Sequence, residues 1–324
     1  MRTPLGWAAE RWTLSPRALR WATTAALVVS IIIVFTGGLV RVTGSGLGCP
    51  DWPTCEGSSI APSPELGIHG VIEFANRLLT TVIVVAVGWV IIAARLQSPR
   101  VRSVTRLAWS QFWLVVANAV AGGITVLVKL NPWVVALHFV LAIALLATTT
   151  LTWHRVHEKR QGPAGAVSPS TGTLAWLLVA LTTALILFGT LVSGSGPHSG
   201  DSAEVPRMQL DWTTFTIIHG VLGAAVLGLA VVMLVTGRGP DARARLVRRR
   251  VLVFLVVVLA QGLVGTVQAL TGLPATLVSF HLLGAALVWV GVLRVLLDAH
   301  PALFAGLGGT VKPLPIPDRT DPRL

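Results

Sequence analysis

Apolar side chains fill eight stretches of the chain, each about 20 residues long, the length that a helix needs to cross a bilayer. The stretches lie at 22–42, 69–94, 107–128, 133–153, 173–193, 214–236, 250–271 and 276–297. Strands are disfavoured, because the edge groups of an open sheet have no hydrogen-bond partners in lipid. The pattern therefore predicts an all-α membrane protein with eight transmembrane helices.

Two short sequences recur at the same interval along the chain. Ile68-His69-Gly70-Val71 returns as Ile218-His219-Gly220-Val221, and Gly44-Ser45-Gly46 returns as Gly194-Ser195-Gly196, each 150 residues later. Each half holds four predicted helices, an even number, so both halves enter the membrane from the same side. The repeat predicts two parallel, pseudo-symmetric four-helix bundles.

The repeat divides the chain into four segments. They are an N-terminal four-helix half at 1–160, a linker at 161–172, a C-terminal four-helix half at 173–298 and a tail at 299–324. The linker is rich in Gly, Pro, Ala and Ser, a composition typical of flexible connections. Residues 1–20 and the tail are polar or proline-rich, and we expect both to be poorly ordered.

The net charge of +12 reports orientation in the membrane. With a cytoplasmic N-terminus, 21 of the 25 Lys and Arg residues fall on the inner side. This asymmetry follows the positive-inside rule, so we expect a multi-pass protein of the cell membrane with both termini in the cytoplasm. Nucleic-acid binding is disfavoured, and the basic run 243–250 is expected to face anionic lipid headgroups.

Four histidines recur at matching places and are the candidate metal ligands. His69, His138, His219 and His281 fall in the first turns of the second, fourth, sixth and eighth predicted helices, all at the outer face. Two imidazoles on opposing helices commonly hold a b-type haem. A single histidine near a helix end more often bonds a carbonyl, but symmetric placement of four favours two related haem or metal sites.

The remaining histidines fall outside this pattern. His154 and His157 lie among basic residues, and we expect them to be solvated in an inner loop. His198 in an outer loop and His300 in the tail have no obvious partner in the sequence.

The first outer loop contains both cysteines of the protein, Cys49 and Cys55. A disulfide between them is chemically permitted on the oxidising side of the membrane and would close a tight loop. Zinc is disfavoured because the four ligands of a structural site are missing. A structural bridge and a redox-active or positioning role both stay open.

One face of the second predicted helix carries polar groups that the second half lacks. Glu73 and Arg77 are spaced i,i+4, with His69 one turn earlier and Asn76 on the same side. Charge compensation within the bundle is one explanation of the pair. The second half has no matching carboxylate, because residues 221–224, directly after His219, are all apolar. The sequence therefore predicts one binding-only site and one chemical site, with Glu73 as its catalytic candidate.

These residues resemble the haem A synthase family, membrane enzymes that convert haem O to haem A. The resemblance rests on Gly37-Gly38-Leu39-Val40-Arg41-Val42-Thr43-Gly44-Ser45-Gly46-Leu47-Gly48-Cys49-Pro50-Asp51-Trp52-Pro53-Thr54-Cys55, on Ile72-Glu73-Phe74-Ala75-Asn76-Arg77, and on Leu137-His138-Phe139. Together with the eight helices and the duplication, it covers nearly the whole chain. The glycine-rich loop with its Cys-Pro-x-Trp-Pro-x-Cys is its most specific part.

The resemblance implies oxidation of a ring methyl of haem O to a formyl by successive O2-dependent hydroxylations, for cytochrome oxidase biogenesis. It implies haem b between His219 and His281 in the second half, and haem O in the first half with Glu73 near the reacting edge. Arg41 and Arg77 are candidates to pair with haem propionates. The implied partners are haem O, O2, an electron donor and the farnesyltransferase that makes haem O, and a homo-oligomer is a further expectation.

The chain departs from the family at one ligand position. Familiar members have a histidine three residues after the glutamate, where this chain has Asn76, and an amide is a poor iron ligand. His69 is our hypothesis for the replacement, since it lies two turns earlier on the same face and matches His219. The alternatives are a di-haem b-type electron-transfer cytochrome and, less favoured, a transporter built from repeats.

Overall fold

The computed structural model describes residues 3–157, 167–201 and 205–301. Over these ranges the regular elements are α1 (Pro4–Arg11), α2 (Pro16–Val42), the 3-10 turn η1 (Pro64–Leu66), α3 (Gly67–Arg95), α4 (Arg102–Leu127), α5 (Pro132–His157), α6 (Pro169–Ser195), α7 (Trp212–Thr236), α8 (Ala242–Leu270) and α9 (Ala275–Ala299). Helices α2 to α9 are long and apolar enough to cross a membrane. The predicted all-α membrane fold with eight spans is confirmed.

The helices extend beyond the apolar stretches at their inner ends. Helix α2 begins at Pro16 instead of 22, and α8 begins at Ala242 instead of 250, while the outer ends lie within a few residues of the prediction. Helical hydrogen bonding continues past the hydrocarbon core, so arginine-bearing turns join the helix at the headgroup level. Hydropathy marks only the apolar part of each helix.

The expectation that residues 1–20 form a poorly ordered tail is wrong for the described residues from 3 onward. Thr3 and Ser15 accept hydrogen bonds from the backbone N–H groups of Gly6 and Ala18, and a proline follows each cap. These are the signals that begin a helix. Helix α6 likewise begins at Pro169, inside the predicted linker, whereas 158–166 and 302–324 lie outside the described residues.

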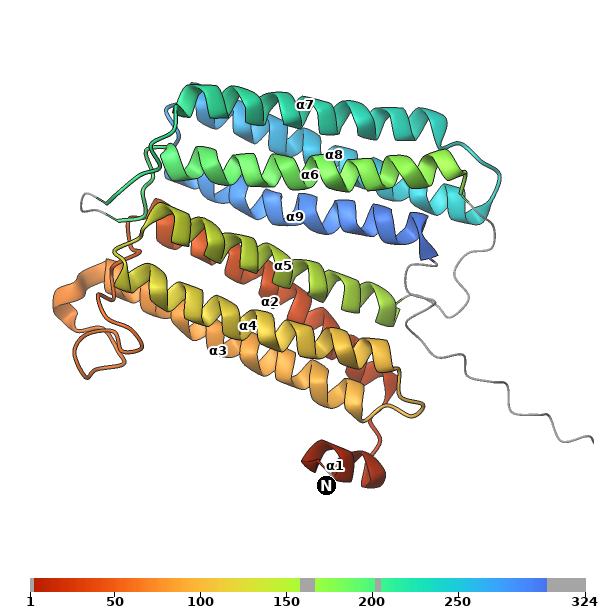
Figure 1. Ribbon diagram of the computed structural model, residues 1–324, viewed down its shortest axis with the longest axis horizontal. Coiled ribbons are helices and arrows are strands. Elements are labelled where there is room, and N and C mark those ends of the chain that lie inside the picture. The colour runs from red at the N-terminus through yellow and green to blue at the C-terminus, as the bar shows by residue number, and fades with distance from the viewer. Residues whose placement is uncertain (1–2, 158–166, 202–204, 302–324) are drawn as a thin grey trace, which may run out of the picture.

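Each half of the chain packs as a closed ring of four helices (Figure 1). In the first half α2 contacts α3, α3 contacts α4, α4 contacts α5 and α5 contacts α2; α6 to α9 pack in the same cyclic order. Helices α3 and α5 therefore lie opposite each other across one ring, and α7 and α9 across the other. These are the helices that carry the four candidate histidines.

The two rings share a core along α2, α5, α6 and α9. Leu27, Val34 and Ile143 of the first half belong to the same buried apolar cluster as residues of all four second-half helices. Trp289 on α9 donates its indole N–H to the carbonyl of Ile143 at 3.1 Å, which satisfies a polar group inside the interface. The shared core sets the position of one ring relative to the other.

The outer loops of the halves also bind each other. The N–H of Gly46 donates to the carbonyl of Gly200 at 2.7 Å, and the N–H of Leu47 donates to Oδ2 of Asp201 at 3.0 Å. Arg41, at the outer end of α2, donates from Nη2 to the carbonyl of Ser193 at 2.7 Å. The recurring Gly-Ser-Gly segment of the first half thus lies at the junction of the two halves.

Candidate functional site

The two candidate histidines of the second half face each other across their ring of helices. His219 is the eighth residue of α7 and His281 the seventh of α9, and their ring centroids lie 6.3 Å apart with the planes at 73°. A metal–imidazole bond is about 2.0 Å long, so two imidazoles on one metal have centroids roughly 6 Å apart. The spacing of His219 and His281 fits two axial ligands of one iron.

Glycines on the neighbouring helices leave room for three of the four rings. A Cβ at Gly189 would lie 2.9 Å from Cε1 of His219, and one at Gly265 would lie 3.2 Å from Cε1 of His281. In the first half a Cβ at Gly122 would lie 3.2 Å from Cε1 of His138. Any larger side chain at these glycines would have to displace an imidazole.

The ring nitrogens of the second pair have different surroundings. Nδ1 of His219 bonds the carbonyl of Leu185 at 3.0 Å, an arrangement that selects the tautomer in which Nε2 is free to bind a metal. Nδ1 of His281 and Nδ1 of His138 are buried and make no hydrogen bond of normal geometry with the described residues. The backbone carbonyls of Gln261 and Asn118 nevertheless interact with these two rings, so each of the three histidines has an acceptor on the neighbouring helix.

The first-half histidines lie on the opposing helices α3 and α5. His69 is half-buried as the third residue of α3, and its Nδ1 lies 2.9 Å from Oγ of Ser45 in the recurring Gly-Ser-Gly segment. His138 is the seventh residue of α5, half-buried against Gly122 of α4. The prediction that all four histidines lie in first turns is correct for His69 only, because the other three are the seventh or eighth residues of their helices and lie about one turn further in.

Glu73 and Arg77 connect α3 to the first outer loop. Oε2 of Glu73 accepts from the N–H of Cys49 at 2.7 Å, and Oε1 accepts from Nη2 and Nε of Arg77 at 2.5 and 3.1 Å. Arg77 also donates to the carbonyls of Cys49, Asp51 and Thr54 at 2.8–3.0 Å. Five donated bonds use the full hydrogen-bonding capacity of a guanidinium.

The loop itself is closed by a disulfide between Cys49 and Cys55, both fully buried. Trp52 inside the loop lies on Gly123 of α4, closer than a side chain at that position would permit. The predicted bridge is therefore present, and its surroundings hold the loop over the outer ends of α3 and α4.

Two further polar residues of the first half have defined partners. Oδ1 of Asn76 accepts from Oγ1 of Thr36 on α2 at 2.8 Å, so this amide joins two helices. Arg41 bonds Ser193, and its Nε is buried with no partner among the described residues. Arg41 thus retains a donor for an acidic group, whereas the donors of Arg77 are all used.

The histidines outside the repeat are not as the sequence predicts. His154 is only 7% exposed, and its Nε2 lies 3.8 Å from Oδ1 of Asp298 on α9. His157 stacks on Trp153 with ring centroids 4.6 Å apart. The expectation of solvated side chains is wrong, because α5 extends through this segment, where His154 faces Asp298 of the other half and His157 lies against Thr24 of α2. His198 and His300 bond the carbonyls of Leu273 and Gly172.

The glycines that accommodate the imidazoles were not predicted, although the spacing of two of them from their histidines repeats in the sequence. Gly122 precedes His138 by sixteen residues, and Gly265 precedes His281 by the same interval. Gly189 has no counterpart at the equivalent position before His69, so only the structure reveals it.

The described residues contain no cluster of three or more His, Cys, Asp or Glu side chains that could hold a metal alone. A haem needs only one or two protein ligands, since the porphyrin supplies the rest. The fold and the paired imidazoles thus define a helical membrane protein of the haem-binding class.

The family model of COX15-CtaA, cytochrome oxidase assembly protein, matches residues 19–69 and 64–293, and the chain belongs to this family. Similar relatives carry the name heme A synthase. The one from Staphylococcus epidermidis (strain ATCC 35984) is 23% identical over 82% of this chain and 90% of its own length. The one from Lysinibacillus sphaericus (strain C3-41) is 33% identical over 42% of this chain and 44% of its own.

Proposed function

We propose that this protein is a haem A synthase, which oxidises the ring methyl of haem O to a formyl by successive O2-dependent hydroxylations for cytochrome oxidase biogenesis. The observation that carries the proposal is an asymmetry between similar halves. Both place histidines on opposing helices, but within the described residues only the first adds a buried carboxylate, Glu73, one turn after its histidine. Family membership and the name of the relatives support the same conclusion.

The second half is proposed to hold haem b through His219 and His281. Held by these two imidazoles, the haem would supply electron transfer. The carbonyl of Leu185 orients His219. Gly189 and Gly265 leave room for the two imidazoles to approach the centre of the four-helix bundle.

The first half is proposed to receive haem O, with His69 and His138 as its ligands. Ser45 bonds His69 through Nδ1, which leaves Nε2 available as a ligand. Arg41 is proposed to bind a haem propionate with its unpartnered donor. For Arg77, the proposed contribution to substrate binding is made through the loop and Glu73, since its five donors are engaged.

Glu73 is proposed as the catalytic carboxylate of the first half. Its Oε2 accepts one hydrogen bond from Cys49 and has a second lone pair available to accept a proton at the substrate edge. Arg77 stabilises the ionised form through two charge-assisted bonds to Oε1. A buried carboxylate with these partners can hold a proton briefly and release it again.

We further propose that the chain lies in the cell membrane with both termini in the cytoplasm. Its half at 1–160 is proposed to bind the substrate haem, and its half at 173–298 the cofactor haem. It uses O2 and an electron donor, and receives haem O from the farnesyltransferase that produces it. Assembly into homo-oligomers is part of the hypothesis.

The test is expression of the full chain in a host that makes haem O, followed by extraction of the haems and identification by chromatography and mass. Haem A or its hydroxylated precursor beside haem b is the expected result. Haem b alone in a folded protein, with haem O available, would instead identify a di-haem electron-transfer cytochrome.

The role of Glu73 is tested by Glu73→Gln with Glu65→Gln as the matched control, since Glu65 is exposed at the same outer end. The expected result is loss of haem A formation in the first variant only, with haem b still bound. Full activity of Glu73→Gln would remove Glu73 from catalysis.

A further inference from the structure

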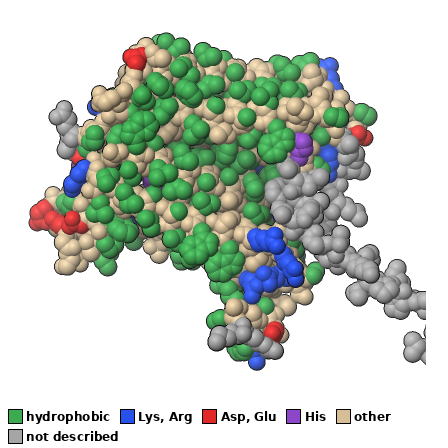
Figure 2. All heavy atoms as spheres, in the orientation of Figure 1, with side chains coloured by type: hydrophobic (Ala, Val, Ile, Leu, Met, Phe, Trp, Pro, Cys, Tyr) green, Lys and Arg blue, Asp and Glu red, His purple; other side chains and the backbone are tan. Residues whose placement is uncertain are grey.

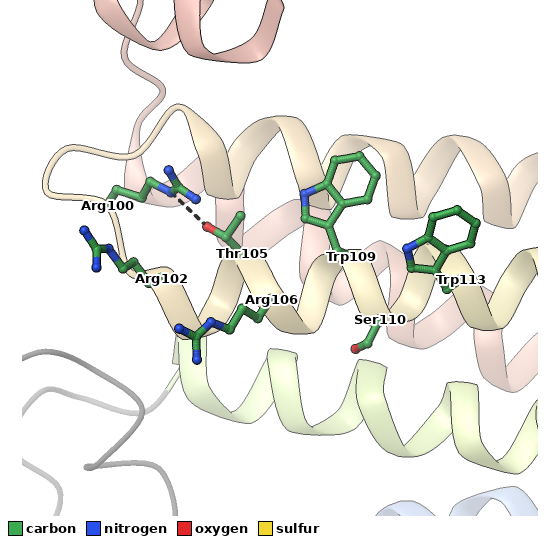
Figure 3. Close-up of a pocket in the computed structure, with 7 residues that line it drawn as sticks. All are labelled: Arg100, Arg102, Thr105, Arg106, Trp109, Ser110 and Trp113. Atoms are coloured by element: carbon green, nitrogen blue, oxygen red, sulfur yellow. Dashed lines mark hydrogen bonds between the residues drawn. The ribbon is translucent and has the colours of Figure 1, made fainter. Parts of the chain in front are cut away.

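A groove far from the candidate haem sites lies at the opposite end of the first half. It is formed by the connection between α3 and α4 and the first three turns of α4, with a volume of about 430 Å³. Its lining is Arg100, Arg102, Thr105, Arg106, Trp109, Ser110 and Trp113 (Figure 3). None of these residues takes part in the proposed haem chemistry.

Three arginines gather at one end of this groove without an acidic partner. Arg100, Arg102 and Arg106 are all exposed, and their one polar contact among the described residues is from Nε of Arg100 to Oγ1 of Thr105 at 3.3 Å. Partial burial and repulsion from Arg95 and Arg102 lower the pKa of Arg100 below its ordinary value. No acidic side chain of the described residues compensates the positive charge of the groove, which favours an anionic ligand.

Two indoles continue the groove toward the apolar part of the span. Trp109 and Trp113 are 39% and 63% exposed, and lie one and two turns beyond Arg106 on the same side of α4. Figure 2 shows the arginine-rich patch directly beside large hydrophobic side chains at this end of the molecule. Tryptophan in a membrane span prefers the level where headgroups meet acyl chains.

The order of these groups along α4 indicates which kind of ligand fits the groove. The charges lie at the helix start, at the level of lipid phosphates, and the indoles lie deeper, at the level of the glycerol and first methylenes. A soluble anion would contact only the arginines and would leave the exposed indoles unused. A nucleic acid would likewise contact only the arginines at the membrane surface and would leave the deeper indoles unused.

We propose that this groove binds an anionic phospholipid, its phosphate held by Arg100, Arg102 and Arg106 and its upper acyl chains packed on Trp109 and Trp113. Arginine suits this ligand because its planar fork donates in pairs to phosphate oxygens. The bound lipid neutralises the repulsion among the arginines and fixes the connection between α3 and α4 at the membrane surface.

The experiment uses the full-length protein in mixed micelles titrated with phosphatidylglycerol or phosphatidylcholine, with retained lipids counted by native mass spectrometry. The wild type is expected to retain one phosphatidylglycerol more tightly than any phosphatidylcholine. The variant Arg100→Gln/Arg102→Gln/Arg106→Gln is expected to lose that lipid, and Arg106→Gln alone to weaken it about fivefold, the contribution typical of one basic residue near anionic lipid.

The matched control removes the same charge from scattered exposed positions at the same end, Arg17→Gln/Arg20→Gln/Arg248→Gln. It is expected to retain the tight lipid. Equal loss in both triple variants, or no preference for phosphatidylglycerol in the wild type, would overturn the proposal. So would inorganic phosphate displacing the lipid at equal concentration, because the acyl contacts would then contribute nothing. Arg106→Gln keeps the test decisive if the triple variant does not fold.

Discussion

Glu73 and Arg77 lie one turn apart on α3 and form an ion pair of 2.5 Å that also holds the disulfide loop. The carboxylate accepts from the backbone of Cys49, and the guanidinium donates to three loop carbonyls. The proposed catalytic group and the loop above it are therefore one hydrogen-bonded unit. A change in the loop must alter the position of the carboxylate, and the reverse also holds.

Arg77→Lys is predicted to loosen the loop. A lysine ammonium has three donors at one point and cannot span Glu73 and three separate carbonyls. Loss of one to two net hydrogen bonds would raise the rate of disulfide reduction by an impermeant phosphine about tenfold. Arg207→Lys is the control, because Arg207 is exposed in another outer loop with one carbonyl contact. Equal rates in wild type and Arg77→Lys would contradict the prediction.

Gly189→Ala is predicted to disturb the second-half histidine pair. The new Cβ would lie 2.9 Å from Cε1 of His219, so either α6 or the ring must shift. Overpacking of this kind costs about 1–3 kcal/mol. We expect lower haem b content and an altered reduced-minus-oxidised spectrum per mole of protein. Gly228→Ala on α7, where a Cβ has open space, should leave the spectrum unchanged.

Gly38→Ala is predicted to strain the contact between the halves. A Cβ at Gly38 would lie 2.5 Å from Cδ1 and 3.3 Å from Cβ of Leu282, the neighbour of His281. The clash should outweigh the gain in helix propensity of about 1 kcal/mol that alanine brings. The readout is a lower thermal midpoint in detergent.

The adjacent Gly37→Ala provides the control for Gly38→Ala, since nothing lies within 4 Å of its Cβ. That variant is expected to be neutral or more stable than the wild type. If both substitutions lowered the midpoint equally, helix propensity and the Leu282 contact would both fail to explain the effect.

Asp298→Asn is predicted to weaken the inner end of the interface. Asp298 is 3% exposed, and its Oδ2 accepts from Nε of Arg250 at 2.7 Å while Oδ1 faces His154 of the other half. Loss of a hydrogen bond to a charged group costs about 1.5–3 kcal/mol, and the guanidinium of Arg250, whose side chain is 28% exposed, is left without its carboxylate. Thermal denaturation in detergent should show the loss, and Asp241→Asn, exposed at the same end, should not. An unchanged midpoint for Asp298→Asn would refute the role of the pair.

Local features of the sequence were enough to predict the class of fold. Eight apolar stretches identified eight spans, because burial in lipid requires an uninterrupted run that is visible in a single segment. The Cys49–Cys55 bridge was also predictable, since a pair so close in sequence can meet without help from the rest of the chain. The chain order of the repeat further placed His219 and His281 on opposing helices.

Contacts between distant segments were decided by the tertiary structure alone. Gly37 and Gly38 are adjacent residues of the same type, and the sequence does not distinguish them. Only Gly38 faces Leu282, because the rotation of α2 about its own axis turns one side of the helix toward α9. His154 sits among basic residues in sequence, but packing of α5 against α9 brings it to Asp298. The sequence by itself determined the eight spanning segments and which side chains can ligate. Only the packing of the two rings decided which of those side chains meet, since that depends on helix rotation and on the sum of many small contacts.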